Sequence, residues 1–224
     1  MYYHLLFILG LIWAGIFIWA YYQKKHQAVF YTKVIASFFF VFASIFILLK
    51  MNTKPDAILV VIGLICGFFG DVFLDLKHVI PKVHKVAFVL GVWAFMCGHL
   101  FYIAYNLLYV IRDFSSTVVL LELVVGVLGF AKIMWLMKKC NPPTILIGLG
   151  VVYLLILDLS FGLALSVMNQ CGILMVLGTF FFMISDHMLI YDYFGKKKYP
   201  LFHGILLVLY YAAQWCIVYS ILGV

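Results

Sequence analysis

Eight long apolar runs, separated by short polar loops, are the feature that most constrains the fold of this chain. Each run has about 20 residues, the length of helix that crosses the hydrocarbon core of a bilayer. The runs are continuous, whereas the strands of a membrane barrel alternate apolar and polar residues. With 67% hydrophobic and 10% charged residues, the chain has more apolar side chain than a soluble interior can pack. The sequence therefore predicts an all-α integral membrane protein, a bundle of eight transmembrane helices.

The predicted helices form a single transmembrane domain over residues 1–224, because no linker or change in composition separates two domains. The first run lacks the basic start and the small-residue cleavage site of a signal peptide, so we interpret it as a spanning helix. The connection between the sixth and seventh runs is very short and lies near Asn169. The expected spans are residues 2–22, 29–49, 57–76, 86–110, 117–137, 144–168, 171–193 and 201–223.

The basic residues gather in alternate loops. The odd-numbered loops hold ten of the fifteen lysines and arginines, and the even-numbered loops hold three. Short loops rich in these residues stay on the cytoplasmic side of a membrane. The sequence therefore predicts that the odd loops are cytoplasmic and that both termini lie outside. The net charge of +7 follows this loop pattern and does not indicate a nucleic-acid-binding surface.

Two aspartates interrupt the apolar runs in similar phrases, Asp71 in Gly-Asp-Val-Phe-Leu and Asp186 in Ser-Asp-His-Met-Leu. A charge at bilayer depth costs at least ~2.5–3.5 kcal/mol on insertion scales, and such residues usually mark a functional site. A shift of 115 residues superposes the two aspartates and also Gly63 on Gly178. The shift favours two four-helix repeats of the same orientation, although chance matches are common in apolar sequence.

Other polar residues lie at similar depths in the predicted spans. Lys33, Asp71, Asp75 and Asp186 all fall in the predicted cytoplasmic half, where opposite charges can neutralise each other. A structural ion pair and an active-site pair explain this pattern equally well. The remaining candidates for supporting a site or binding a substrate are His99, Tyr102, Tyr153, Ser185, Tyr210 and Gln214.

Four further ionisable residues lie in the predicted spans, and three of them have a structural interpretation. Glu122 and Lys132 lie near opposite ends of the fifth span and are interpreted as interfacial, and His187 is as readily a packing residue as a participant. Asp158 lies near the middle of the sixth span. Motifs for serine hydrolysis, zinc proteolysis and phosphate binding are missing from the sequence. We expect acid/base chemistry without a cofactor, although two carboxylates and a histidine could hold a metal.

Together these motifs resemble the YhhN family of multi-spanning membrane proteins, which includes the animal lysoplasmalogenases. The resemblance covers most of the chain. Where family members often have proline after the second-span lysine, this chain has Val34, and the stretch before Asp71 lacks a small polar residue; both departures leave substrate choice open. The matching residues are Thr32-Lys33, Gly70-Asp71-x-x-Leu74, Gly91, Phe95, Gly98-His99-Leu100-x-Tyr102, Ser185-Asp186-x-x-Leu189 and Tyr210-x-x-x-Gln214.

The resemblance implies a membrane hydrolase that cleaves the vinyl-ether bond of lysoplasmalogens to a fatty aldehyde and glycerophosphoethanolamine or glycerophosphocholine. This chemistry needs a protonated acid and a negative charge beside an oxocarbenium ion, roles that Asp71 and Asp186 could divide in either order. Lys33 would hold one of them ionised or contact the phosphate. The implied partners are a lysophospholipid and membrane lipids, without nucleic acid, in a bacterial cytoplasmic membrane.

Two other functions use the same residues. Buried acids, a histidine and a lysine are also features of a small proton-coupled transporter. The length of 224 residues is small for such a carrier, and no span is strongly broken by proline. A lipid-binding or structural membrane protein, whose acids only form ion pairs, is the third interpretation.

Overall fold

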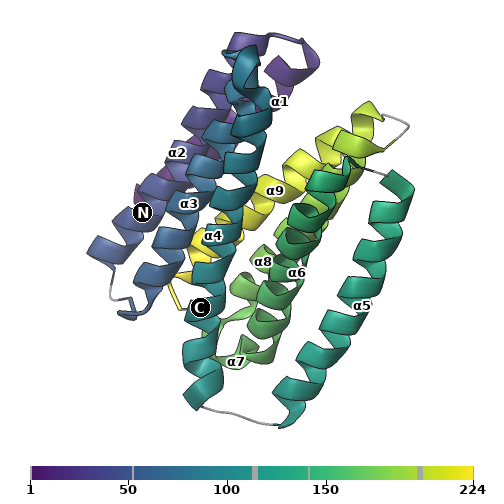
Figure 1. Ribbon diagram of the computed structural model, residues 1–224. Coiled ribbons are helices and arrows are strands. Elements are labelled where there is room, and N and C mark those ends of the chain that lie inside the picture. The colour runs from purple at the N-terminus through teal and green to yellow at the C-terminus, as the bar shows by residue number, and fades with distance from the viewer. Residues whose placement is uncertain (1, 52, 113–115, 141, 196–198, 224) are drawn as a thin grey trace. The chain divides into compact units, whose positions relative to one another are not determined.

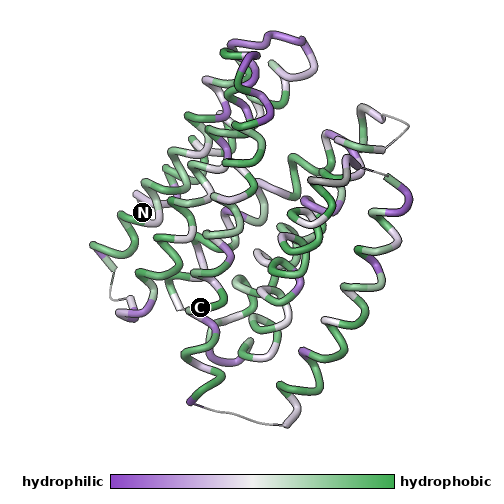
Figure 2. Tube along the Cα trace, in the orientation of Figure 1, coloured by the Kyte–Doolittle hydropathy of each residue, from purple (hydrophilic) through white to green (hydrophobic). Residues whose placement is uncertain are grey.

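The computed structural model describes residues 2–51, 53–112, 116–140, 142–195 and 199–223 (Figure 1). Within these ranges every regular element is a helix. Eight of the described helices are long and apolar enough to cross a membrane. Apolar residues follow the helix shafts, and the more hydrophilic residues gather mainly at helix ends and loops (Figure 2). The predicted multi-pass α-helical architecture is confirmed, while the sidedness of the loops stays a prediction.

The chain divides into two compact units, of which the first extends to Tyr102 and includes residues 221–223. Helix α1 packs on α2 and α2 packs on α3. Small residues such as Ala36 and Ala43, both fully buried in α2, let neighbouring helices approach closely. The elements of this unit are α1 (Tyr2–Tyr22), α2 (His26–Lys50), α3 (Ala57–Asp75), the 3-10 turns η1 (Leu76–His78) and η2 (Pro81–Val83), and α4 (His84–Arg112) as far as Tyr102.

The second unit extends from Ile103 to Ser220 and therefore includes the last part of α4. Its helices pack in sequence order, α5 on α6, α6 on α8 and α8 on α9. Large apolar side chains of α5, α6 and α9, such as Leu120, Val152 and Val208, are exposed, as expected for contact with lipid. The further elements are α5 (Ser116–Cys140), α6 (Thr144–Ser166), the short α7 (Met168–Cys171), α8 (Ile173–Phe194) and α9 (Pro200–Ser220).

The connection before α8 corrects two predicted boundaries. Helix α6 ends at Ser166, not at residue 168, and α8 begins at Ile173, not at residue 171. Between them α7 ends at Cys171 and is followed by Gly172, whose φ of 80° lies in the left-handed region that glycine adopts without steric strain. Hydropathy does not detect this turn because the residues around it are apolar. The other predicted boundaries agree with the structure within three residues.

Contacts of the helix pair α3–α4 correspond to contacts of the pair α8–α9. A side chain on Gly63 would overlap Tyr102 and approach the carbonyl oxygen of Gly98 to 2.9 Å. A side chain on Gly178 would likewise meet Ile217 and approach the carbonyl oxygen of Ala213 to 3.1 Å. Each residue of the second set follows its counterpart by the 115 residues of the predicted repeat.

A second pair of contacts follows the same shift. A Cβ on Gly91 would lie 3.2 Å from the carbonyl oxygen of Gly70, and the Ser185 hydroxyl donates to the carbonyl oxygen of Leu206 at 3.0 Å. Ser185 and Leu206 lie 115 residues after Gly70 and Gly91. These matched contacts are what an internal repeat requires, and the repeat and its orientation stay predictions.

Candidate functional site

In the first unit, Lys33 of α2 lies between two carboxylates of α3. Its Nζ atom is 3.2 Å from Asp71 Oδ1 and 3.2 Å from Asp75 Oδ2. Asp71 is 1% exposed and Lys33 is 7% exposed. Because the two aspartates are four residues apart, they share one helix face and one ammonium group can contact both. The grouping of these three residues, predicted from their depth and spacing, is therefore found in the structure.

The second oxygen of Asp71 binds a donor that sequence reasoning missed. The Ser37 hydroxyl, fully buried, donates to Asp71 Oδ2 at 2.5 Å. Ser37 follows Lys33 by one helical turn, so both donors project from the same face of α2. One carboxylate oxygen thus lies beside an ammonium group and the other accepts a hydrogen bond, an arrangement that suits an anion. The spacing of Lys33 and Ser37 by one turn of a helix was the feature of the sequence that could have indicated this contact.

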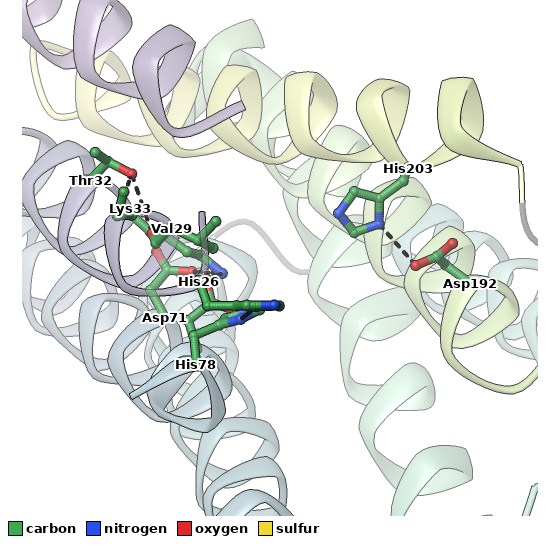
Figure 3. Close-up of polar contacts among 10 residues, drawn as sticks. His26, Val29, Thr32, Lys33, Asp71, His78, Asp192 and His203 are labelled. Carbon is green, nitrogen blue, oxygen red and sulfur yellow. Dashed lines mark hydrogen bonds and ion pairs between the residues drawn. The ribbon is translucent and has the colours of Figure 1, made fainter. Parts of the chain in front are cut away.

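Two histidines lie at the end of this cluster (Figure 3). The Nδ1 atoms of His26 and His78 are 3.3 Å apart, and their rings stack with centroids 5.5 Å apart. His78 Nε2 is 3.7 Å from Asp75 Oδ1. His26 is exposed, whereas Asp75 is buried. The contacts form a continuous series of ionisable groups from an exposed histidine through Asp75 and Lys33 to Asp71.

His99 and Tyr102, predicted to share one face of α4, form a buried pair in the first unit. They are 1% and 2% exposed. Their rings meet edge to face, with centroids 5.2 Å apart. Tyr102 also occupies the space above Gly63 of α3. The pair therefore helps α4 to pack on α3, and its predicted role toward substrate stays a prediction.

In the second unit, the hydroxyl of Tyr153 in α6 donates to Asp186 Oδ2 in α8. Both residues are 4% exposed. The structure therefore joins two residues that were predicted as candidates from separate spans. Ser185, the neighbouring candidate, instead donates to the Leu206 carbonyl oxygen of α9. Ser185 thus holds α8 against α9, a structural contact rather than a contact with the aspartate.

The candidates in α9 form their own hydrogen bond. Gln214 Nε2 donates to the Tyr210 hydroxyl oxygen at 3.0 Å, and both side chains are buried. The Tyr210 ring meets Phe182 of α8 edge to face, with centroids 5.5 Å apart. Phe182 precedes Asp186 by one helical turn, so the pair packs on the helix that carries the aspartate. Near the C-terminus of α8, Asp192 Oδ2 lies 2.8 Å from Nδ1 of His203 in α9 (Figure 3).

A further charged cluster in the second unit was missed by sequence reasoning. Lys132 Nζ of α5 is 3.0 Å from Asp158 Oδ1 of α6, and His187 Nε2 of α8 is 3.9 Å from the same oxygen. Asp158 is 2% exposed. The interpretation of Lys132 as interfacial overlooked this pairing. Opposite charges in consecutive spans were the clue that the sequence offered.

Glycines make room for carboxyl groups where α5 meets α6. The Asp158 carboxyl lies against Gly129, where any side chain would overlap it. Glu122 of α5 similarly lies 2.7 Å from the position that a Cβ on Gly162 of α6 would occupy. The Ser166 hydroxyl donates to Glu122 Oε1 at 3.3 Å. The two helices therefore approach closely enough to enclose polar groups between them.

The candidate residues belong to different units of the chain. Asp71 lies in the first unit and Asp186 in the second, so the predicted division of roles between them stays a prediction. In the part of the chain that the structure describes, no three His, Cys, Asp or Glu side chains gather closely enough to hold a metal ion.

Comparison with known proteins gives one match. The model of the YhhN family matches residues 27–221. No curated protein and no solved structure matches the chain. The matched range covers nearly the whole chain and includes all of the candidate residues from Lys33 to Gln214. The chain therefore belongs to the YhhN family.

Proposed function

We propose that the protein is a lysoplasmalogenase-like hydrolase of the membrane, which cleaves the vinyl-ether bond of a lysoplasmalogen. Membership of the YhhN family supports the reaction class. The observation that carries the proposal is the buried Asp71 carboxylate, which has a lysine on one oxygen and a serine hydroxyl on the other. A charge held in this way inside apolar helices can stabilise a cation that forms during a reaction. The products are a fatty aldehyde and glycerophosphoethanolamine or glycerophosphocholine.

The reaction needs one proton donor and one proton acceptor. The acid gives a proton to the outer vinyl carbon, and an oxocarbenium ion forms at the carbon bonded to oxygen. Water adds to that carbon and loses a proton to the base. The resulting hemiacetal then gives its hydroxyl proton back to the deprotonated acid. Its bond to the glycerol oxygen breaks as that oxygen takes the proton held by the base, and the aldehyde is released. Both side chains return to their starting states, so no cofactor is consumed.

We assign the ionised role to Asp71, because the Lys33 ammonium forms an ion pair with one of its oxygens and Ser37 donates to the other. In this position it stabilises the oxocarbenium ion and accepts the proton of the attacking water. The requirement for one acid and one base then assigns proton donation to Asp186. The hydroxyl of Tyr153, bound to Asp186 Oδ2, orients that carboxyl group. The assignment of Asp71 follows from its contacts in the first unit, and that of Asp186 follows from the need for one acid.

Aldehyde release by the purified protein tests the proposal. The full chain in detergent micelles is incubated with a lysoplasmalogen, and free fatty aldehyde is measured over time. The matched control substrate is an ester-linked lysophospholipid of the same chain length, which contains no vinyl ether and releases no aldehyde. A folded protein that releases no aldehyde from either headgroup class of lysoplasmalogen would refute the proposed reaction.

One observation favours proton-coupled transport as the second candidate. The series His26, His78, Asp75, Lys33 and Asp71 connects an exposed histidine with a buried carboxylate. Such a series could carry protons toward the interior of the first unit. Proteoliposomes that enclose a pH-sensitive dye distinguish the two functions. A transporter acidifies or alkalinises the lumen when a lysophospholipid or another solute is added, whereas a hydrolase only releases aldehyde.

A further inference from the structure

The second unit contains a cavity of about 580 Å³ between α5, α8 and the start of α9. This volume lies within the range of pockets that bind small molecules. Its walls are largely aromatic and aliphatic, with Trp135 and Met183 among the lining residues. Three basic side chains also line it: Lys132, Lys139 and His187. An apolar cavity with a few polar groups is suited to an amphiphile.

The charges around the cavity favour an anion. Lys132 and Lys139 lie two turns apart on α5, about 10 Å along the helix at 1.5 Å per residue. Asp158 compensates Lys132 from 3.0 Å, while Lys139 lies over the rings of Trp135 and Tyr191 at 4.5 and 5.1 Å. The described lining residues together with Asp158 thus carry two ammonium groups and one carboxylate. The surplus of one positive charge matches the single negative charge of a phosphodiester.

His187 adds a hydrogen-bond acceptor to the same wall. Its Nδ1 lies 2.7 Å from the Met183 carbonyl oxygen, a contact that requires the proton on Nδ1. In the neutral ring Nε2 is then an acceptor. That atom is buried and has no hydrogen-bond partner among the described residues, and Asp158 Oδ1 is 3.9 Å away. A ligand hydroxyl could therefore donate to Nε2.

We propose that this cavity binds a lysophospholipid, a lipid with one chain, one phosphodiester and one free glycerol hydroxyl. The phosphodiester contacts the Lys132 ammonium, whose side chain is 41% exposed, and Lys139 contributes the surplus charge. The glycerol hydroxyl donates to His187 Nε2, and the single chain packs against the aromatic and aliphatic walls. The inference rests on the proposed function, because it names a binding site for the proposed class of substrate. Its test measures binding and needs no catalytic turnover.

The test measures binding of palmitoyl-lysophosphatidylethanolamine, an ester lipid that is not a vinyl-ether substrate, to the full chain in detergent. Native mass spectrometry over a lipid titration reports the apparent Kd. Monopalmitoylglycerol, which lacks the phosphate, and inorganic phosphate, which lacks the chain, are the two matched ligands. We expect each to bind at least about tenfold more weakly, because a charge-assisted contact or the apolar contacts are lost.

The test variant is the double substitution Lys132→Gln with Asp158→Asn. It removes the ammonium together with its buried counter-charge, so no uncompensated carboxylate remains in the helix interface. We expect about a tenfold or greater loss of lysophospholipid affinity. Lys138→Gln, on the same helix but not among the lining residues, should bind as the wild type does. A second variant, Ile184→Trp, fills the cavity without changing a charge and should also weaken binding.

Two outcomes overturn the inference. One is unchanged lysophospholipid affinity in the double variant and in Ile184→Trp, with thermal unfolding showing that both are folded. The other is equal affinity for the lysophospholipid and for either matched ligand. The aldehyde assay separates these results from the proposed reaction. Binding that depends on Lys132 in a protein that releases no aldehyde supports the cavity and refutes the hydrolase, and the reverse pattern refutes only the cavity.

Discussion

The two units each hold an aspartate at a position that the predicted repeat would match, but they surround it with different partners. Asp71 of the first unit binds a lysine and a serine of α2, and Asp186 of the second unit binds a tyrosine hydroxyl of α6. An ammonium group favours the negative carboxylate. A phenol can donate to a carboxyl oxygen in either protonation state. Asp71 and Asp186 can therefore differ in protonation state, which is what an acid/base reaction requires.

The two units also differ in charged residues at the positions that the predicted repeat would match. Lys33 has its counterpart 115 residues later at Gly148, and Asp75 has its counterpart at Ile190. The second unit therefore has no lysine and no second carboxylate at these places. Its lysine–carboxylate contact is built from other positions, with Lys132 of α5 facing Asp158 of α6. The two units therefore have a few matching helix contacts but place their charges at different positions.

The largest effect is expected from replacing either aspartate. Asp71→Asn and Asp186→Asn keep the side-chain shape but remove the acid, and each should lower the rate of aldehyde release by about 10²–10⁴-fold. Thermal unfolding in detergent should show both proteins folded. Full activity in one variant would mean that only the other aspartate performs the chemistry, and the comparison between the units would lose its functional meaning.

Lys33→Met breaks the charge balance of the first unit alone. Two carboxylates, Asp71 and Asp75, then stay buried without their shared ammonium group. Loss of one partner of a buried ion pair typically costs about 3–5 kcal/mol. We expect a large fall in thermal unfolding temperature at neutral pH. Adding Asp75→Asn and Asp71→Asn to Lys33→Met should restore much of the stability, and failure to do so would show that the lysine acts by packing.

The matched glycines test whether the units share their helix packing. Gly63→Ala and Gly178→Ala place a methyl group against the facing helix in each unit. Each should destabilise the protein by about 1–3 kcal/mol, because the packed helices must move apart. Gly126→Ala, with open space around its Cβ position, is the control and should be close to neutral. A loss at only one of the two matched glycines would contradict the correspondence.

Removing the hydroxyl donors compares the two aspartates directly. Tyr153→Phe should lower kcat by about tenfold, since a hydrogen bond to a carboxyl group is lost. Ser37→Ala should lower it less, because Asp71 keeps its contact with Lys33. The measurement is kcat together with KM for aldehyde release. Equal effects, or changes in thermal stability with kcat preserved, would mean that the hydroxyls only hold helices together.

The smallest effect is expected for Asp75→Asn. Lys33 keeps its contact with Asp71 in this variant, and the second unit has no carboxylate at the matching position. The rate of aldehyde release should change by no more than a few fold, because the assigned acid and base both keep their carboxyl groups. A loss as large as that of Asp71→Asn would transfer the acid/base pair to Asp71 and Asp75 within the first unit.

The sequence predicted the helices well but their contacts unevenly. The grouping of Lys33, Asp71 and Asp75 was predictable because spacing along one helix defines a face. The contact of Lys132 with Asp158 was not, because a lysine eight residues from a helix end also fits the membrane interface. Ser37 was overlooked because a single serine hardly changes the hydropathy of an apolar run.

The sequence by itself determined the eight helices that are long and apolar enough to cross a membrane, and the place of each polar residue along them. A bilayer leaves a run of apolar residues no other way to satisfy its backbone than a helix. Only the tertiary structure decided which donor meets which carboxylate, because this depends on how each helix is rotated about its axis. Packing sets that rotation, for example where Gly63 admits Tyr102 and Gly129 admits Asp158, and these contacts join residues far apart in the chain.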